Sequence, residues 1–215
     1  EAGGRKEGRH DVGQLGNRAR PARPAVRALL GDHPRIAAHA AWTIWNITGE
    51  EQEVIRELVE LIHTGHPDVV QFSAYALGSL GPKALDVAPT LRVERERLSG
   101  ATRLHVAEAL TRIDAFDDAS VQVLTGALQD RSPHQRWLAA LALGHVQTRH
   151  VDTAVPALIA ALQDPDSEVR SAAALSLGGF GPEASEAIPE LQRRATLDAP
   201  SVREAAVTAL ACIRR

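Results

Sequence analysis

The sequence predicts an all-α protein, an α-solenoid built from about six copies of a two-helix unit. The segment LGSLGPKALDVAPTL at residues 77–91 returns at 177–191 as LGGFGPEASEAIPEL, with Leu, Gly, Gly, Pro, Ala, Pro and Leu in the same places. Two more degenerate copies lie between them, so the repeated unit is about one third of a hundred residues long. Periods of this length are typical of solenoids, in which stacked units share one continuous core.

Composition favours thin helices over a sheet. Of the 215 residues, 44% are hydrophobic but only 3% are aromatic. A core so poor in rings is built from closely packed Ala and Leu helices more readily than from a thick sheet sandwich. The net charge of −3 provides no general attraction to nucleic acid or to anionic lipid.

Cysteine usage and hydropathy indicate a cytoplasmic location. Cys212 is the only cysteine, which excludes an internal disulfide and fits a reducing compartment. No apolar run approaches the roughly 18 residues of a membrane span, so we expect no membrane association. The sequence contains no Met, so we expect the translational start, and any leader before it, to lie upstream.

The second half of each unit is expected to be an inner helix that begins near a proline. These prolines are Pro34, Pro67, Pro133, Pro165 and Pro200, and Ser99-Gly100 replaces one of them. Each follows a short loop and precedes an Ala-rich stretch, as in the first turn of a helix. Asp164 and Ser132 directly precede two of them and are expected to act as caps. The inner helices are predicted near residues 34–48, 67–80, 101–113, 133–147, 166–180 and 200–214.

The inner helices align in twelve columns. Column one is occupied by Ile36, Val69, Thr102, Gln135, Val169 and Val202. Columns one, five, eight, nine and twelve are mostly apolar or small, which is close to the i, i+4, i+7, i+8, i+11 stripe of one helix face. Small residues at columns five and eight allow a partner helix to approach closely.

An outer helix is expected before each inner one, with apolar runs at residues 25–30, 54–62 and 155–162. Prolines recur one turn or so inside it and either start or kink the helix. They are Pro24, Pro89, Pro156 and Pro189. Gly-Pro at 81–82 and at 181–182 ends one unit and begins the next.

These signals divide the chain into a single array with units near 17–49, 50–82, 83–114, 115–147, 148–182 and 183–215. Residues 1–16 are expected to be a frayed remnant of a preceding repeat, because VGQLG at 12–16 matches LGSLG at 77–81. We therefore expect further repeats upstream in the parent protein.

The pattern resembles the HEAT repeat superfamily, particularly the short bacterial type also found in phycobilisome-lyase-like proteins. The resemblance covers nearly the whole chain and rests on VRSAAALSLG at 169–178, on GPEASEAIPEL at 181–191 and on the loop aspartates. The spacing is shorter than the ~40–47 residues usual for HEAT units. Ankyrin and tetratricopeptide signatures are absent.

The resemblance also implies a role for charged residues that recur from unit to unit. In HEAT repeats the arginine at column two forms a ladder with the aspartate of a neighbouring loop. The matching residues are Arg103, Arg136, Arg170 and Arg203, with Asp130, Asp164 and Asp198. We interpret this ladder as structural, since a row of phosphate-binding arginines would not have acids beside it.

The sequence contains no recognisable catalytic or metal-binding motif, so we expect no enzyme activity, no cofactor and no metal. His63 and His66 flank a glycine and supply only half of a metal site, so we interpret them as part of a solvated loop. Deoxyhypusine hydroxylase is an enzyme built on HEAT repeats, but its iron ligands come from His-Glu pairs, and no His here is followed by Glu.

Columns three and seven are expected to lie beside each other on the inner helices and to form a concave binding stripe. Column seven reads Trp42, Tyr75, Glu108, Leu141, Leu175 and Thr208, and column three contributes Gln71, Leu104 and Trp137. We expect the binding residues to be Trp42, Gln71, Tyr75, Glu108, Trp137 and Leu141. Partly exposed aromatic side chains are typical anchors for a partner. Trp45 stands at column ten and is expected to be more buried.

The favoured function is therefore a non-enzymatic scaffold that binds a protein or peptide on its concave face. One alternative is a binder of nucleic acid or of a modified base, similar to the HEAT-like DNA glycosylases. Arginines at positions 18, 20, 23 and 27 favour it, but the net acidity makes a nucleic-acid partner the weaker hypothesis. A second alternative, a chromophore-lyase-like subunit, rests on the repeat resemblance alone.

Overall fold

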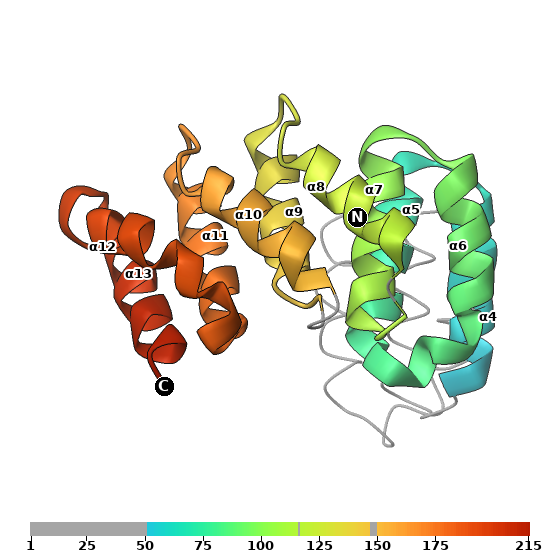
Figure 1. Cartoon of the computed structure of the whole chain (residues 1–215). Helices are drawn as coiled ribbons and strands as arrows, with labels where there is room; N and C mark the ends of the chain where they lie inside the picture. Colours follow the sequence, from blue (N-terminus) through green and yellow to red (C-terminus); the bar gives the residue numbers. More distant parts are fainter. Residues whose placement is uncertain (1–50, 116, 147–149) are drawn as a thin grey trace, which may run out of the picture. The chain divides into compact units, whose positions relative to one another are not determined.

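The computed structural model describes residues 51–115, 117–146 and 150–215, and every regular element in these ranges is a helix (Figure 1). The predicted all-α fold is confirmed. The chain divides into two compact units, residues 1–109 and 110–215, and each is described by itself. The expected remnant 1–16, the unit 17–49 with its inner helix, Trp42 and Trp45 lie outside the described residues.

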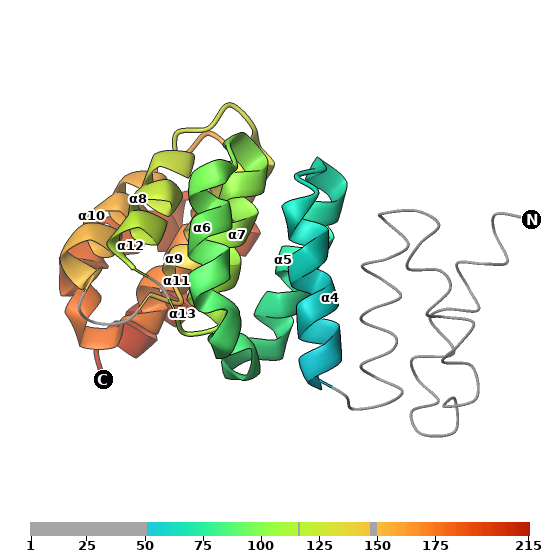
Figure 2. The same ribbon diagram turned by 90° about the vertical axis from the view of Figure 1, so that its right-hand side faces the viewer.

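The first unit contains α4 (Glu51–His63) packed against α5 (Pro67–Leu80) (Figure 2). The 3-10 helix η2 (Gly81–Val87) and α6 (Ala88–Arg97) follow, and both contact α4. Helix α7 (Gly100–Arg112) begins in this unit. Gly81 ends α5 with a φ of 58°, a left-handed conformation that glycine adopts without strain, and so lets the chain turn directly into η2.

The second unit contains two layers of helices. Its helices are α8 (Asp118–Ala127), α9 (Pro133–Leu143), α10 (Val151–Ala161), α11 (Ser167–Gly179), η4 (Gly181–Ala187), α12 (Ile188–Leu197) and α13 (Pro200–Ile213). The inner helices α9, α11 and α13 pack side by side, while α8, α10 and α12 each cover the inner helix that follows them. This is the pairing that the alternation of outer and inner segments predicts.

The predicted units from residue 50 onward each hold an outer and an inner helix in the described part of the chain. The inner helices begin at or within one residue of the predicted positions, and α9 ends earlier, at Leu143. The grouping of these units into one array stays a prediction.

The core follows the aligned columns. The leucines of column nine, Leu77, Leu110, Leu143 and Leu177, are 0% exposed, and Leu210 in the last helix is 9% exposed. The small or β-branched residues of column five are also 0% exposed: Ser73, Val106, Ala139, Ala173 and Ala206. Each buried leucine contributes about 1.5–3 kcal/mol relative to an exposed one, so this column is a main source of stability.

Glycine at column ten sets how closely the inner helices of the second unit approach. A Cβ added to Gly178 would lie 2.9 Å from the Cα of Ala209, and one added to Gly144 would lie 2.6 Å from the Oγ of Ser176. Ser176 Oγ donates a hydrogen bond to the Ala140 carbonyl at 2.8 Å. The backbones of α9, α11 and α13 therefore meet where glycine faces a small residue at column eight.

The expected caps at Asp164 and Ser132 are wrong. Helix α11 is capped by Asp166, whose carboxylate accepts from the N–H groups of Glu168 and Val169, because the loop extends two residues beyond Asp164. Asp164 accepts instead from Asp166 N–H and binds Arg136. Ser132 occupies the cap position of α9, but its side chain makes no capping bond.

The prolines of the outer helices differ in their role. Pro89 and Pro189 lie in the first turns of α6 and α12, whereas Pro156 lies inside α10.

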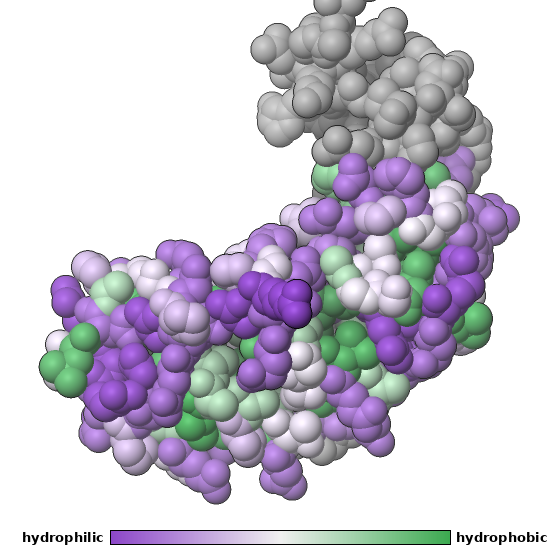
Figure 3. Space-filling view, turned by 90° about the horizontal axis from the view of Figure 1, so that it is seen from above, coloured by the Kyte–Doolittle hydropathy of each residue, from purple (hydrophilic) through white to green (hydrophobic). Residues whose placement is uncertain are grey.

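Among the described helices, none combines the length and the apolar character that crossing a membrane requires. The face seen in Figure 3 is mostly hydrophilic, with hydrophobic side chains scattered over it.

Candidate binding surface and the charged contacts between repeats

Arg136 on α9 binds the aspartate of the next loop through two hydrogen bonds. Its Nε donates to Asp164 Oδ2 at 2.7 Å and its Nη2 donates to Asp164 Oδ1 at 2.8 Å. Its Nη1 donates to the carbonyl of Asp130, in the loop before its own helix, at 3.0 Å. One planar guanidinium therefore joins two successive loops.

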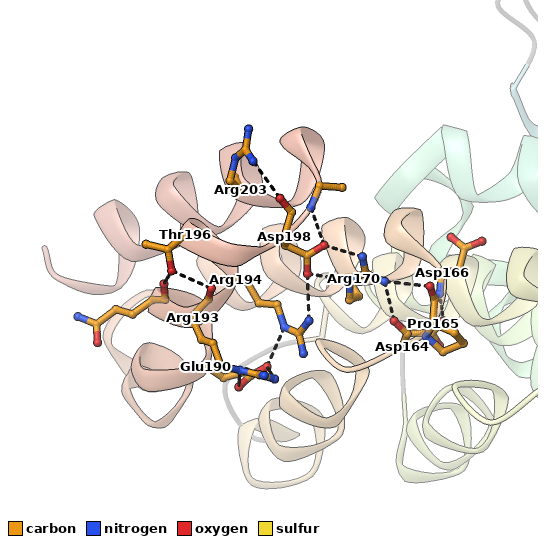
Figure 4. A network of polar contacts seen from close by, with 12 residues as sticks. Asp164, Pro165, Asp166, Arg170, Glu190, Arg193, Arg194, Thr196, Asp198 and Arg203 are labelled. Atoms are coloured by element: carbon orange, nitrogen blue, oxygen red, sulfur yellow. Dashed lines mark hydrogen bonds and ion pairs between the residues drawn. The ribbon is translucent and has the colours of Figure 1, made fainter.

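Arg170, on α11, repeats the same geometry in the next repeat (Figure 4). Its Nε donates to Asp198 Oδ2 at 2.9 Å, its Nη2 donates to Asp198 Oδ1, and its Nη1 donates to the Asp164 carbonyl at 2.7 Å. Asp198 also accepts from Arg194 Nη1 at 3.0 Å. The carboxylate thus joins α11 to both helices of the last repeat.

These contacts shift the pKa values of both aspartates downward. The hydrogen bond from Arg170 is the main cause that lowers the pKa of Asp198, and it outweighs burial, which raises it. For Asp164, burial raises the pKa, but the hydrogen bonds from Arg136 and from the Asp166 backbone lower it to a net value below the ordinary one. Both carboxylates are therefore held in the charged form.

The other predicted ladder residues have different contacts. Arg203 donates its Nη1 to the Asp198 carbonyl at 3.1 Å. Asp130 uses its carboxylate to accept from Ser132 N–H at 2.8 Å. Arg103 donates to Glu96 Oε2, on the outer helix of its own repeat, at 3.1 Å. The structure therefore brings together Arg136 with Asp164 and Arg170 with Asp198.

A second charged cluster, which the sequence analysis missed, lies in the first unit. Glu94 on α6 is 3% exposed. Its Oε1 lies 2.7 Å from His63 Nδ1, and its Oε2 accepts from Arg97 Nε at 2.9 Å. Arg97 Nη2 also donates to the His63 carbonyl at 2.8 Å. No other repeat has His, Glu and Arg at the equivalent positions, so the periodic pattern carried no signal for this cluster.

The cluster holds Glu94 as a carboxylate. Burial raises the pKa of Glu94, but the hydrogen bonds from Arg97 and His63 lower it to a net value below the ordinary one. His63 is exposed, as expected, but its assignment to a loop is wrong, because it ends α4 and contacts a buried acid. In the described ranges no group of three or more His, Cys, Asp or Glu residues is placed to hold a metal ion.

The predicted binding residues are distributed over both units. In the first unit, Tyr75 on α5 is 59% exposed, and Gln71 lies one turn earlier, half-buried. Glu108 on α7 is only 6% exposed, so its assignment to an exposed stripe is wrong. Residues 104–111 of α7 are all buried, so this helix is covered on every side over this stretch. Its residues at columns three and seven, Leu104 and Glu108, are therefore buried too.

In the second unit, columns three and seven of α9, α11 and α13 form a surface that we call the inner-helix face. Its residues are Trp137, Leu141, Ser171, Leu175, Glu204 and Thr208. Trp137 and Leu141 are half-buried, and Leu175 is 49% exposed. The Trp137 ring stacks on His134, one turn earlier, with centroids 5.6 Å apart and planes inclined by 21°. The sequence analysis did not single out His134, although its spacing from Trp137 is that of neighbours on one helix face.

Part of the chain is similar to a known repeat family. Residues 136–211 match the family model described as HEAT repeats. A search of curated proteins found no match. An engineered protein of known structure is 21% identical, with a TM-score of 0.61, over 90% of this chain and 96% of that one.

Two further structures are similar to this chain. The complex of CpcE and CpcF of phycocyanin lyase from Nostoc sp. PCC7120 is 23% identical, with a TM-score of 0.54, over 74% of this chain and 98% of that one. A designed armadillo repeat protein in complex with the peptide (KR)4 is 16% identical, with a TM-score of 0.58, over 89% of this chain and 99% of that one. Residues 136–211 are therefore similar to HEAT repeats, and the chain has the α-solenoid fold of HEAT and armadillo-like repeat proteins.

Proposed function

We propose that this protein is a non-enzymatic scaffold that binds a protein or peptide on its inner helices. The observation that carries the proposal is the inner-helix face, where Trp137, Leu141 and Leu175 remain partly exposed in a chain with only 3% aromatic residues. Partly exposed aromatic and aliphatic side chains on one surface are typical anchors of a protein interface.

The similar structures support a binding role. The designed armadillo protein is described with a bound peptide, and CpcE is described in a complex with CpcF. In both cases a helical repeat protein holds another polypeptide. Gln71 and Tyr75 are a separate candidate surface on the first unit, and the assignment of Trp42 stays a prediction.

We propose that binding involves no turnover and occurs in the cytoplasm. The acidic side chains with lowered pKa values, Asp164, Asp198, Glu94 and Glu190, are each bound to arginine. Asp164, Asp198 and Glu94 join neighbouring repeats, whereas Glu190 binds arginines of its own helix. None of the four is poised for proton transfer at neutral pH, which requires a pKa near the working pH. The single cysteine, Cys212, supports a reducing compartment.

The test is selection of a random twelve-residue peptide library on the immobilised full chain. We expect enriched peptides whose affinity falls about 30-fold, or about 2 kcal/mol, in Trp137→Ala and in Leu175→Glu. Val93→Glu is the matched control, because Val93 is 66% exposed on the outer helix α6. Failure to enrich any peptide, or enriched peptides that bind Trp137→Ala as tightly as the unchanged chain, would contradict the proposal.

A chromophore-lyase-like subunit is the second candidate, and the likeness to the CpcE–CpcF complex over 74% of this chain favours it. It predicts that the chain accelerates the attachment of a chromophore to phycocyanin, which visible absorbance of the denatured product would detect.

The nucleic-acid alternative has no comparable support, because Arg136 and Arg170 are paired with aspartates. A salt titration of binding to a DNA duplex should therefore find no affinity above background.

A further inference from the structure

The N-terminal halves of α11 and α13 carry two glutamates on the helix face that contains columns three and seven. Glu168 lies in the first turn of α11, one position before column one, and Glu204 occupies column three of α13. Both residues are exposed. Within the part of the chain that the structure describes, neither side chain makes a hydrogen bond or an ion pair. Two carboxylates without a partner, Glu204 of the inner-helix face and Glu168 one turn before Ser171, therefore lie beside its apolar residues.

The columns of α9, α11 and α13 that carry these side chains contain no basic residue other than His134. Lys and Arg are absent from column three, column seven and the position before column one in all three helices. Arg136 and Arg170, at column two, are turned into the loops by their aspartate partners. Arg203 donates to a loop carbonyl. Arg131 is exposed in the loop before α9, outside the three helices, and Arg214 and Arg215 follow the last residue of α13, at the opposite end of that helix from Glu204.

An aromatic pair lies on the same surface. His134 is exposed in the first turn of α9 and stacks on the half-buried Trp137. The face of a tryptophan ring attracts a lysine or guanidinium cation through its quadrupole, and it also accepts an apolar side chain. Leu175, 49% exposed on the next helix, offers a second apolar contact.

We propose that the inner-helix face of the second unit takes a cationic polypeptide segment in which Lys or Arg side chains alternate with apolar ones. The cations pair with Glu168 and Glu204, and the apolar side chains contact Trp137, Leu141 and Leu175. This proposal rests on the proposed scaffold function and adds the chemistry of the bound segment. The free carboxylates set its charge, and the arginines after α13 exclude its basic residues from the far end of the face.

The experiment uses the full chain and two fluorescein-labelled octapeptides, Lys-Leu repeated four times and Glu-Leu repeated four times, in anisotropy titrations. We expect the Lys-Leu peptide to bind at least about tenfold more tightly than the Glu-Leu peptide, because each exposed ion pair contributes up to about fivefold. We also expect its affinity to fall as NaCl is raised from about 50 mM to about 500 mM, since salt screens exposed charges.

Two double variants separate a specific site from general attraction. Glu168→Lys with Glu204→Lys should weaken the Lys-Leu peptide by about 30-fold or more, because two attractive pairs become repulsive. Glu183→Lys with Glu186→Lys is the matched control, since both residues are exposed on η4 and the net charge changes by the same amount. Should the first variant fail to fold, Glu168→Gln with Glu204→Gln should still weaken binding by about fivefold.

Equal losses in the two double variants would overturn the proposal, as would a Glu-Leu peptide that binds as tightly as the Lys-Leu peptide. The library selection distinguishes this failure from a failure of the scaffold function. Enriched peptides that need Trp137 but contain no Lys or Arg would leave the scaffold function standing and contradict this inference. A library with no binders would contradict the scaffold function itself.

Discussion

The two units of this chain join neighbouring repeats with different charged contacts. In the second unit, an arginine on an inner helix binds the loop aspartate 28 residues further on, as in Arg170 and Asp198. In the first unit the contact joins two outer helices, from His63 at the end of α4 to Glu94 on α6, 31 residues away. Both contacts bridge adjacent repeats, and both centre on a carboxylate that is at most 5% exposed.

The difference follows from where each repeat carries its acid. The loops before α5 and α7, residues 64–66 and 98–99, contain no aspartate, and column two of α5 is the buried Val70. The acid is supplied instead by the outer helix. The comparison teaches that the junctions built on Glu94, Asp164 and Asp198 each contain one buried carboxylate, although its position within the repeat differs between the two units. A buried carboxylate must be paired wherever it lies, so each arrangement recruits its own arginine.

The largest expected effect is in the second unit. Arg170→Ala should lower the free energy of unfolding by about 3 kcal/mol, because it leaves the 5% exposed Asp198 with fewer partners. Urea denaturation followed by circular dichroism measures the change. Arg203→Ala is the control, since this exposed arginine has only a loop carbonyl as partner, and should change the free energy by less than about 0.5 kcal/mol. Equal losses of unfolding free energy in both variants would contradict a stabilising role for the contact between Arg170 and Asp198.

A somewhat smaller loss is expected where the inner helices touch. Gly178→Ala should cost about 1–3 kcal/mol, because the new Cβ would lie 2.9 Å from the Ala209 backbone. In α8, Gly126 has open space around it, so Gly126→Ala should stabilise by about 0.5–1 kcal/mol through helix propensity alone. Thermal unfolding of the two variants should therefore shift in opposite directions, and a stabilised Gly178→Ala would contradict the close approach.

Glu94→Gln in the first unit should cost less than Arg170→Ala, about 1–2 kcal/mol. Its partners His63 and Arg97 are 41% and 49% exposed. Water can therefore replace part of the hydrogen bonding that these two side chains lose with the Glu94 carboxylate. Glu60→Gln, on the exposed side of α4, is the matched control and should be nearly neutral. Urea denaturation that ranked Glu94→Gln above Arg170→Ala would reverse our comparison of the two units.

The pH dependence should be the smallest effect near neutrality. The folded pKa of Asp198 is below its ordinary value of 3.8, so its stabilisation is complete above that value and is lost as the pH falls through the folded pKa. The difference in unfolding free energy between the unchanged chain and Asp198→Asn should stay constant from about pH 7 to about pH 5 and then shrink in acid. A difference that grows below pH 4 would contradict the charged pair.

Periodicity explains both what the sequence predicted and what it missed. Arg136 and Arg170 recur at column two, and the resemblance to HEAT repeats implied their pairing with the loop aspartates. Glu94 occurs once and gave no periodic signal. Glu108 shared a column with Tyr75, but burial depends on what packs around each helix, which a column does not encode. Asp166, and not Asp164, caps α11 because the loop continues for two residues after Asp164 and the helix begins only at Ser167.

The central claim is that the charged contacts hold the repeats together while the inner-helix face binds a partner. Trp137→Ala tests it most directly when unfolding and peptide affinity are measured on the same preparation. We predict a stability loss smaller than that of Arg170→Ala and well below the ~3–5 kcal/mol of a fully buried tryptophan. We also predict an affinity loss of about 30-fold for a library-selected peptide. A Trp137→Ala variant that loses more stability than Arg170→Ala and binds the peptide unchanged would contradict the account.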